Sequence, residues 1–255
     1  PPSRFAVPES GEDVERFLGS RRIEAFEVRQ HLGLVSVTCQ PTCAAVTING
    51  LVRWTIPRGL GGLEAWAGTP GTVGGAIHGN AHWQQVNIGD VVESVRVIDR
   101  EGQLRQVPAD RLEFAYDSSR LQRTGEVVLW AAFRVTAGQS PEVLRETARA
   151  SLAFRKRTQP LASPSAGCIF QNPQPGRDAV PDGIPPSAGA LIDRAGLKGQ
   201  AIGGARVSET HANFIVNDGT ATAADIGALI DWCRRAVLER YGVTLREEIV
   251  RLGRW

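Results

Sequence analysis

The sequence is poor in three features that place a protein in a class at once: charge of one sign, long apolar runs and cysteine. Lys and Arg number 29 against 27 Asp and Glu, a net charge of +2, so the chain lacks the basic field of a dedicated nucleic-acid binder. Its longest wholly apolar run, residues 127–133, is far shorter than the ~20 residues of a membrane helix. No charged-then-apolar leader is visible, so we expect a cytoplasmic protein.

Cysteine is scarce, with four residues in 255: Cys39, Cys43, Cys168 and Cys233. A set this small and scattered does not form the disulfide framework of a secreted domain, so we expect reduced thiols. Cys39 and Cys43 stand four positions apart, but no second Cys or His pair follows at the spacing of zinc ligands. We therefore expect no metal site.

What the sequence does have is an ordinary globular composition, 42% hydrophobic and 22% charged over 255 residues, which allows one large domain or two modest ones. Eight glycines in residues 59–79 argue against any regular element there, and residues 158–189 should be mostly loop. Residues 46–56 stay open, with a helix that ends before Pro57 as one interpretation. Capping signals predict helices over residues 11–18, 140–155 and 222–242. Apolar and β-branched runs predict strands over residues 23–28, 32–38, 91–99, 103–107, 127–135 and 245–252.

The first segment that could carry chemistry is glycine-rich and runs from Ala67 to Ala81. Glycines let a backbone approach a ligand closely, and successive N–H groups in such a loop form an anion-binding concavity. Thr72 adds a hydroxyl that can bond a phosphate oxygen. Because the spacing matches neither standard phosphate-binding motif, two interpretations remain: a nucleotide or pyrophosphate cradle, and a structural glycine-rich turn.

Three further segments carry single reactive or polar side chains. Cys168 follows small residues and precedes an amide and a proline, so it is either a proton donor at the edge of a pocket or a buried thiol. On a strand, Glu247 and Glu248 point to opposite faces, which turns one carboxylate inward unless both form an exposed acidic edge. His211 and Asn213 share a strand face in the same way, and either contact a ligand or belong to a half-buried strand.

Taken in order, these segments resemble the UDP-N-acetylenolpyruvoylglucosamine reductase (MurB) family. Each stretch is weak evidence alone, whereas the ordered set, from about residue 46 to the end, is specific. No tyrosine-bearing insertion of the substrate domain is visible, which indicates the shorter subtype. The matching stretches are residues 59–64 (GLGGLE), 70–76 (PGTVGGA), 166–173 (AGCIFQNP), 187–189 (SAG), 195–199 (AGLKG), 211–217 (HANFIVN) and the closing 245–253.

The resemblance implies an α+β protein with an FAD-binding domain of the vanillyl-alcohol-oxidase (PCMH) type at residues 1–137. A smaller α+β substrate-binding domain at 138–244 would follow, and a closing strand at 245–255 would return toward the flavin site. The implied activity is FAD-dependent and consumes NADPH: the enolpyruvyl ether of a UDP-sugar is reduced to UDP-N-acetylmuramate for peptidoglycan synthesis. The expected partner is this small molecule, not a nucleic acid or a membrane, and the oligomeric state stays open.

The same resemblance assigns roles to residues. Cys168 stands at the proton-donor position of the family's Gly-Ser-x-Phe motif, and Glu248 matches its C-terminal glutamate, which helps to stabilise the enolate-like intermediate. Gln171 and Asn172 fall where the family contacts substrate. The FAD contacts are expected from a set in the glycine-rich segment: Pro70, Gly71, Thr72, Gly74, Gly75, Gly79 and Asn80.

Two stretches substitute residues of the family pattern. Asp117 stands where a Tyr-Arg-x-Ser motif places an arginine that helps to hold the intermediate, and Arg120 or Arg123 are the alternatives for supplying that charge. His82 and Trp83 replace small residues of the family, where they either cover the flavin or block it.

A third departure concerns the beginning of the chain. The strand and Gly-x-Gly-Ser-Asn loop that the family places after its first helix are not visible near residue 20, so the segment 70–79 would be the main flavin cradle and FAD affinity should fall. The rival hypothesis is therefore a flavin-poor relative that binds a UDP-sugar without turning it over. A third is a sequence that has lost a segment.

Overall fold

The computed structural model describes residues 26–31, 34–39, 43–83 and 86–253, so the predicted helix at 11–18 and the loop missing near residue 20 lie outside the described residues. The chain divides into two compact units, residues 1–153 and 154–255, each described here by itself. The sequence places this boundary at 137/138, whereas the structure places it inside α5 (Pro141–Thr158). The reason is that Leu144 and Ala148 of α5 belong to the apolar core of the first unit.

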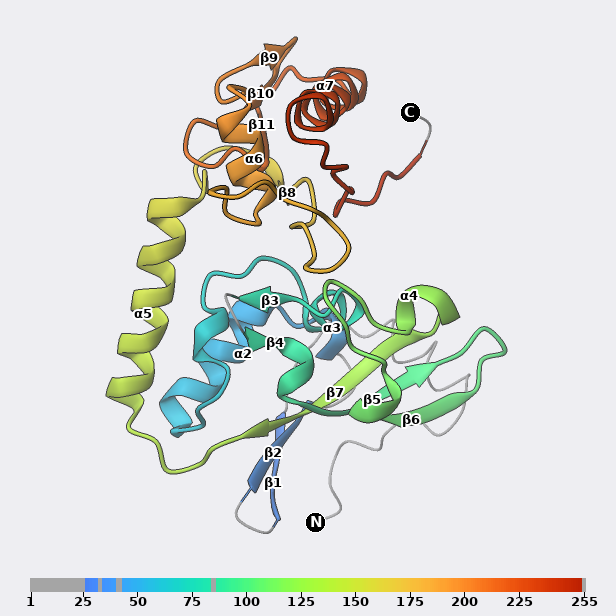
Figure 1. The fold of residues 1–255 in the computed structure, drawn as a ribbon. Helices are drawn as coiled ribbons and strands as arrows, with labels where there is room; N and C mark the ends of the chain where they lie inside the picture. The colour runs from blue at the N-terminus through green and yellow to red at the C-terminus, as the bar shows by residue number, and fades with distance from the viewer. Residues whose placement is uncertain (1–25, 32–33, 40–42, 84–85, 254–255) are drawn as a thin grey trace. The chain divides into compact units, whose positions relative to one another are not determined.

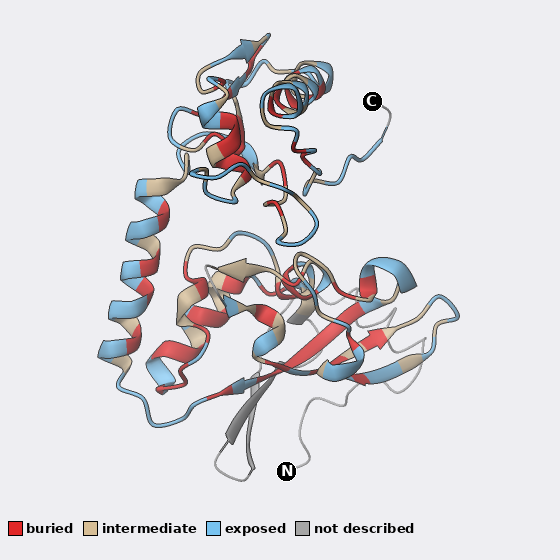
Figure 2. Cartoon of the chain, viewed as in Figure 1, coloured by how far each residue is buried: buried red, intermediate tan, exposed pale blue. Residues whose placement is uncertain are grey.

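The first unit is built on a five-stranded antiparallel sheet in the order β1-β2-β7-β5-β6 (Figure 1). β7 lies at its centre because it is almost wholly apolar: residues 128–133 are all buried, so both faces of the strand are covered (Figure 2). The predicted strand at 127–135, the hairpin of 91–99 with 103–107 and the strands in the region 23–38 are confirmed. The strands are β1 (Phe26–His31), β2 (Leu34–Cys39), β5 (Val92–Ile98), β6 (Leu104–Pro108) and β7 (Val127–Val135).

Two helices of the first unit follow from local capping. Thr47 caps α2 (Ile48–Thr55), because its hydroxyl accepts a hydrogen bond from the Gly50 N–H at 3.0 Å, and the helix ends before Pro57. Thr72 caps α3 (Val73–His78) in the same way. The expectation that residues 59–79 hold no regular element is therefore wrong: a capping threonine and apolar neighbours outweigh the low helix propensity of glycine.

Shorter elements complete the first unit. A small hairpin joins β3 (His82–Trp83) to β4 (Val86–Asn87). The remaining elements are α4 (Leu121–Thr124) and the 3₁₀ helices η1 (Cys43–Ala45), η2 (Ile56–Arg58), η3 (Glu64–Trp66), η4 (Ile88–Asp90) and η5 (Ala109–Arg111).

The second unit packs helices on a four-stranded sheet of order β8-β11-β10-β9. α7 (Ala223–Tyr241) contacts α6 (Ala188–Arg194), β9 and β10. The sequence predicted α7 closely: Thr222 and Asp225 form a capping box at its start, and Gly242 ends it with a φ of +70°. The strands are β8 (Ser165–Cys168), β9 (Ala201–Ile202), β10 (Ala205–Val207) and β11 (Phe214–Asn217).

The strand predicted at 245–252 is wrong in extent. The closing segment forms one isolated bridge, between Phe170 and Glu247, flanked by hydrogen bonds from the Gln171 N–H to the Arg246 carbonyl and from the Glu248 N–H to the Ile169 carbonyl. Pro173 lacks an N–H and cannot extend this ladder. Among the described residues, none of the helices combines the length and the hydropathy that a bilayer-spanning segment requires.

Candidate functional site

In the first unit, the glycine-rich segment forms a loop that leads into α3. Hydrogen bonds from the Ile48 N–H to the Gly71 carbonyl (3.1 Å) and from the Val73 N–H to the Val46 carbonyl (2.8 Å) fix this loop against the start of α2. The Thr72 hydroxyl accepts a hydrogen bond from the Gly75 N–H at 3.2 Å. Its own hydrogen is left to donate, so the hydroxyl can serve the helix and a ligand oxygen at once.

The loop has the features of an anion cradle. In the part of the chain that the structure describes, the backbone N–H groups of Gly71, Thr72 and Gly74 donate to no protein acceptor. Gly71 has a φ of +94° and open space where a β-carbon would stand, and both Gly71 and Gly75 are exposed. Three N–H groups and one hydroxyl at the start of a helix suit phosphate oxygens. These residues therefore fit the pyrophosphate of the FAD that the resemblance implies.

The other expected FAD residues border this loop or support it. Pro70 is exposed at its start, and Gly79 ends α3, where its N–H bonds back to the Gly75 carbonyl. Gly74 packs so closely on η1 that a β-carbon would lie 3.0 Å from Ala44. Asn80 is 3% exposed, so its side chain acts as a scaffold inside the unit and is not on the surface of the cradle.

An asparagine that the sequence analysis missed supports the same loop. Asn49, on α2, accepts a hydrogen bond from the Gly68 N–H at 2.6 Å and donates one to the Thr69 carbonyl at 3.1 Å. Its partners are 19 and 20 positions away, so periodicity could not reveal it. The signal that could have found it is its type: a polar residue on the buried side of an apolar helix needs a partner.

A second loop, which carries Ala115 and Ser119, packs on residues 78–82 through two side-chain hydrogen bonds, and a third joins Asn80 to Gly89 of η4. Asn80 donates to the Ala115 carbonyl (2.7 Å) and accepts from the Gly89 N–H (3.0 Å), while the Ser119 hydroxyl donates to the His78 carbonyl (2.8 Å). The stretch with Asp117, which departs from the family pattern, is therefore held against the end of the glycine-rich segment.

Both arginines that could replace the family's arginine form ion pairs with glutamates. Arg120 binds Glu126 through Nη2, at 2.6 and 2.8 Å from the two carboxylate oxygens. Arg123 forms an ion pair with Glu113. Asp117 itself lies 3.1 Å, Oδ1 to Nδ1, from His82, so two residues that depart from the family pattern contact each other.

In the second unit, an asparagine fixes the segment that carries Cys168. Cys168 ends β8, opposite Phe214, and is half-buried. The buried Asn213 accepts a hydrogen bond from the Phe170 N–H (2.9 Å) and donates one to the Phe170 carbonyl (2.7 Å). The side chain thus pairs with the backbone as a neighbouring strand would. Asn213 lies in a turn before β11, so the expectation that His211 and Asn213 share a strand face is wrong.

His211 is also a structural group. Its Nδ1 accepts a hydrogen bond from the Asn213 N–H at 3.2 Å. Burial, reinforced by the charge of Lys198, holds the pKa of His211 below its usual value, so the ring is neutral at pH 7. Gly189 has room for no side chain, because a β-carbon there would lie 3.0 Å from the imidazole.

The closing segment brings Glu248 beside the Cys168 segment, since the Glu248 N–H donates to the Ile169 carbonyl at 2.8 Å. Strand alternation predicts that one of the two carboxylates turns inward without saying which: the Glu248 side chain is exposed, and the Glu247 side chain is partly buried. The carboxylate with strong partners is Glu247, which binds Arg251 (2.8 and 2.9 Å) and Arg234. The Arg251 hydrogen bonds, followed by those of Arg234, hold the pKa of Glu247 below its usual range despite partial burial.

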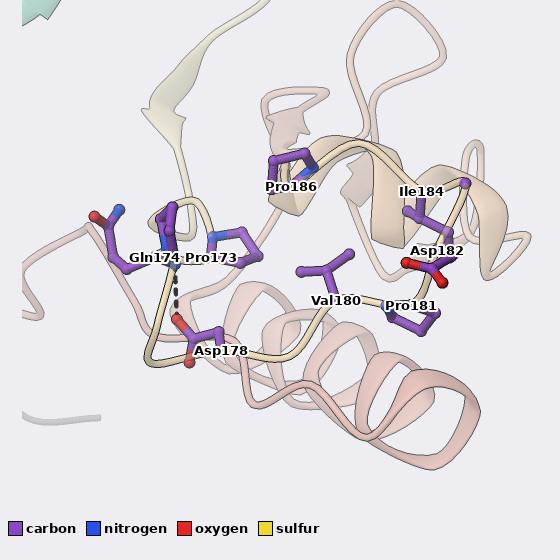
Figure 3. Close-up of a pocket in the computed structure, with 10 residues that line it drawn as sticks. Pro173, Gln174, Asp178, Val180, Pro181, Asp182, Ile184 and Pro186 are labelled. Atoms are coloured by element: carbon purple, nitrogen blue, oxygen red, sulfur yellow. Dashed lines mark hydrogen bonds between the residues drawn. The ribbon is translucent and has the colours of Figure 1, made fainter.

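Gln171 and Asn172 lie at the edge of a proline-rich loop. Asn172 accepts a hydrogen bond from the Ala188 N–H at 3.0 Å and so supports the start of α6, while Gln171 is half-buried beside it. A cavity of about 310 Å³ follows, shown in Figure 3 and lined by Pro173, Gln174, Pro175, Asp178, Val180, Pro181, Asp182, Gly183, Ile184 and Pro186.

Asp178 is the anchored charge of this cavity. It accepts a hydrogen bond from the Gln174 N–H at 2.8 Å and binds Arg246 at 3.0 and 3.1 Å. Burial raises the pKa of Asp178, but the Gln174 N–H and the guanidinium groups outweigh it and leave the pKa below its usual value. The cavity wall is therefore largely apolar, with one carboxylate, Asp178, fixed by Arg246 and a second, Asp182, beside it in the lining.

Metal and thiol chemistry are limited in the part of the chain that the structure describes. It holds no group of three or more His, Cys, Asp or Glu side chains placed to bind a metal ion. Cys233 is buried in α7, and burial raises the pKa of its thiol to about 12. Cys233 is therefore inert, in contrast to the half-buried Cys168.

Comparisons with known proteins find matches to both units. A profile of the UDP-N-acetylenolpyruvoylglucosamine reductase C-terminal domain matches residues 159–252, and one of an FAD binding domain matches residues 40–107. The protein of Heliobacterium modesticaldum named UDP-N-acetylenolpyruvoylglucosamine reductase is 44% identical over 206 residues, 81% of this chain and 62% of the relative. The protein of that name from Synechococcus sp. strain CC9605 is 40% identical over 234 residues, 91% of this chain and 73% of the relative.

A solved structure extends the likeness to three dimensions. The crystal structure of UDP-N-acetylenolpyruvylglucosamine reductase (MurB) from Thermus caldophilus aligns with a TM-score of 0.65 and 35% identity, over 80% of this chain and 69% of that chain. Together with the two relatives, it shows that the chain spans between 62% and 73% of the length of proteins of this kind.

Proposed function

Because the chain belongs to the UDP-N-acetylenolpyruvoylglucosamine reductase family, we propose that it reduces UDP-N-acetylglucosamine enolpyruvate to UDP-N-acetylmuramate, with FAD as cofactor and NADPH as hydride source. The observation that carries this proposal is the 40% identity over 234 residues, since a match of that length spans both units. The reaction is a step of peptidoglycan precursor synthesis, and the proposed compartment is the cytoplasm.

The first unit binds the cofactor, whose contribution when bound is hydride relay from NADPH to the substrate. The N–H groups of Gly71, Thr72 and Gly74 and the Thr72 hydroxyl hold the pyrophosphate oxygens. The geometry of the loop supports this role. The loop is exposed, and these N–H groups donate to no protein acceptor in the described part of the chain. Gly75, Gly79 and Pro70 shape the loop, and Asn80 fixes the end of this segment to Ala115 and Gly89.

The second unit supplies the proton. Cys168 gives its Sγ proton to the carbon next to the one that receives hydride, so that the double bond gains one hydride and one proton. NADPH leaves as NADP⁺, and the thiolate takes a proton from solvent. A thiol suits this step because its reference pKa, about 8.5, is far closer to neutrality than that of a hydroxyl. Two observations support this role of Cys168: its side chain is half-buried, and Asn213 fixes the backbone of the nearby Phe170.

Two further roles complete the proposal. Glu248, exposed beside the Cys168 segment, contacts the carbon skeleton of the substrate as the intermediate forms. Gln171 and Asn172, which directly precede the cavity-lining residues in the chain, contact the UDP-sugar.

The test is a visible absorption spectrum of the purified chain, before and after adding excess FAD and removing the unbound fraction. We expect flavin bands at roughly one FAD per chain. Anaerobic NADPH should then bleach them, and UDP-N-acetylglucosamine enolpyruvate should restore them. A folded protein that stays colourless would contradict the reductase proposal. Binding of the UDP-sugar to such a colourless protein, measured by calorimetry, would instead support the flavin-poor rival.

A further inference from the structure

One residue of the closing segment, Arg246, is attached at two points to the stretch of chain that follows Cys168. Its carbonyl accepts a hydrogen bond from the Gln171 N–H at 2.9 Å. Its guanidinium binds the Asp178 carboxylate, with Nη1 at 3.0 and 3.1 Å from the two oxygens. The backbone and the side chain of Arg246 therefore hold the two ends of residues 171–178.

The side-chain attachment continues a connection that the backbone cannot extend. Residue 173 is a proline, which has no N–H to donate to the closing segment. In the part of the chain that the structure describes, the backbone pairing that begins at the Phe170–Glu247 bridge ends with the Gln171 N–H. Beyond Gln171, the ion pair of Arg246 with Asp178 joins the two stretches.

Asp178 is a rigid partner for this ion pair. Its side chain is 7% exposed, and it accepts a hydrogen bond from the Gln174 N–H at 2.8 Å (Figure 3). A carboxylate so enclosed needs a cation, and its neighbour Arg177 supplies one, with Nε 3.0 Å from Oδ2. Arg246 is thus a second cation on the same carboxylate. What it adds is a connection between two parts of the chain.

The closing segment is also held from the side of α7. Arg234 binds Glu247 and donates a hydrogen bond to the Leu245 carbonyl at 3.4 Å. Glu248 follows directly, and its N–H donates to the Ile169 carbonyl at 2.8 Å. Residues 245–248 are therefore fixed between α7 and the stretch 169–178.

We propose that Arg246 and Asp178 are positioning residues for Glu248. Their ion pair limits the movement of the closing segment relative to residues 171–178, so that the Glu248 carboxylate stays beside the bound substrate. The assignment rests on the proposed function, in which Gln171, Asn172 and Glu248 contact the substrate. A displacement of about 1 Å at a reacting centre can cost on the order of 100-fold in rate, so a pair that itself touches no reacting atom can still control turnover.

The test compares the two guanidinium groups that bind Asp178. Arg246→Gln removes the connection between the two stretches, whereas Arg177→Gln removes a cation within one of them. The second variant is the matched control, because the two side chains are 41% and 44% exposed. Arg246→Lys keeps the charge, and Asp178→Asn removes it while keeping an acceptor for the Gln174 N–H.

The FAD-loaded variants are assayed for flavin bleaching by NADPH and for kcat and KM of the UDP-sugar in reoxidation, after thermal unfolding has shown that each is folded. We expect kcat to fall about 10-fold in Arg246→Gln and in Asp178→Asn. KM should change little, because Asn172 keeps its own hydrogen bond from the Ala188 N–H. Arg246→Lys should recover most of the loss, and Arg177→Gln should have the kcat of the unmodified chain. Bleaching by NADPH should be equal in all of them.

A double-variant experiment shows whether the ion pair acts through Glu248. In a Glu248→Gln background, Arg246→Gln should lower kcat no further, because a positioning residue has no effect once the group that it positions is gone. A merely structural role would add its loss to that of Glu248→Gln.

Hydrogen exchange tests the connection without any turnover. The N–H groups of Gln171 and Glu248 should exchange up to about fivefold faster in Arg246→Gln, the size expected for a partly exposed ion pair, and at an unchanged rate in Arg177→Gln.

Two results would overturn the assignment: equal kcat in Arg246→Gln and Arg177→Gln, or additive losses in the Glu248→Gln background. Failure of the proposed function is distinguishable from both. In that case the unmodified chain binds no FAD or is not reoxidised by the UDP-sugar, while the difference in hydrogen exchange between Arg246→Gln and Arg177→Gln persists.

Discussion

The glycine-rich loop of the first unit and the Cys168 segment of the second present two different kinds of surface. The loop offers backbone N–H groups and one hydroxyl, with glycines where side chains would obstruct. The Cys168 segment offers a thiol, and the closing segment bonded to it offers the carboxylate of Glu248. A binding surface made of backbone groups tolerates most substitutions, except those that alter φ or place a side chain where the ligand would lie. A surface made of side chains loses its function when a single one of them is replaced. The two units should therefore respond to mutation in different ways.

The supporting structure beneath these surfaces is the same in both units. Asn49 in the first and Asn213 in the second each use one amide to bond a backbone N–H and a backbone carbonyl of the functional segment. The difference is burial: Phe170, the partner of Asn213, is 1% exposed, while the partners of Asn49 are half-buried. The two asparagines allow the comparison to be tested with matched substitutions.

The largest effect is expected in the second unit. Cys168→Ala should lower turnover about 10²- to 10⁴-fold, the usual contribution of a proton donor, because no other hydrogen replaces the Sγ proton. Bleaching of bound flavin by NADPH should be unchanged, since it needs no proton from Cys168. Stopped-flow absorbance separates the two steps.

Cys168→Ser is the control for that experiment. It keeps a donor hydrogen and restores the residue of the family motif, so it should retain most of the activity. Unchanged turnover in Cys168→Ala would remove the proposed role of the thiol.

A smaller effect should distinguish the two asparagines. Asn213→Ala leaves the buried N–H and carbonyl of Phe170 without partners, which costs about 1–3 kcal/mol for each group. Asn49→Ala exposes its backbone partners to water, so the loss should be about 0.5–1.5 kcal/mol for each bond. Hydrogen exchange of peptides from each unit reads the two effects separately. Equal losses of protection would show that burial does not distinguish the supports.

A still smaller effect tests the backbone character of the cradle. Gly71→Ala adds a β-carbon at a φ of +94° on the proposed phosphate surface, and Gly102→Ala adds one at +79° in the β5–β6 turn, with open space at both. Each should lose about 1 kcal/mol of stability through strain. Gly71→Ala alone should weaken FAD binding, by about tenfold, which corresponds to ~1.4 kcal/mol. Equal FAD affinity in the two variants would exclude the loop as the phosphate site.

Much of the fold could be predicted because its signals are local. Thr222 and Gly242 bound α7, and an unbroken apolar run defines β7. The errors arose where tertiary packing and capping outweighed a local sequence propensity. Glycine density argued against α3, yet the Thr72 cap and the buried Val73 and Ile77 form it.

The candidate site divides in the same way. The glycine-rich loop and Cys168 were identifiable from residue type and spacing. The supports were not, because Asn213 and Asp117 meet their partners 43 and 35 positions away. Strand alternation predicted that Glu247 and Glu248 differ in burial, as they do. It could not say which is the more buried, because the partners of Glu247 include Arg234 on α7, 13 positions away.

The smallest expected effect concerns that carboxylate pair. Arg251 and Arg234 hold the pKa of Glu247 below its usual value, so the folded state binds its proton more weakly than the unfolded state. This contribution to stability is therefore present above the unfolded pKa, about 4.3, and is lost as pH falls through the lower folded pKa. Glu247→Gln should cost about 0.2–1 kcal/mol at pH 7 and nothing below the folded pKa.

The exposed Glu146 forms no ion pair in the described residues, so Glu146→Gln should leave the pH dependence of unfolding unchanged. If the two variants show the same pH dependence of unfolding, Arg234 and Arg251 do not stabilise the closing segment through Glu247. The contrast between a paired Glu247 and an exposed Glu248 would then not hold.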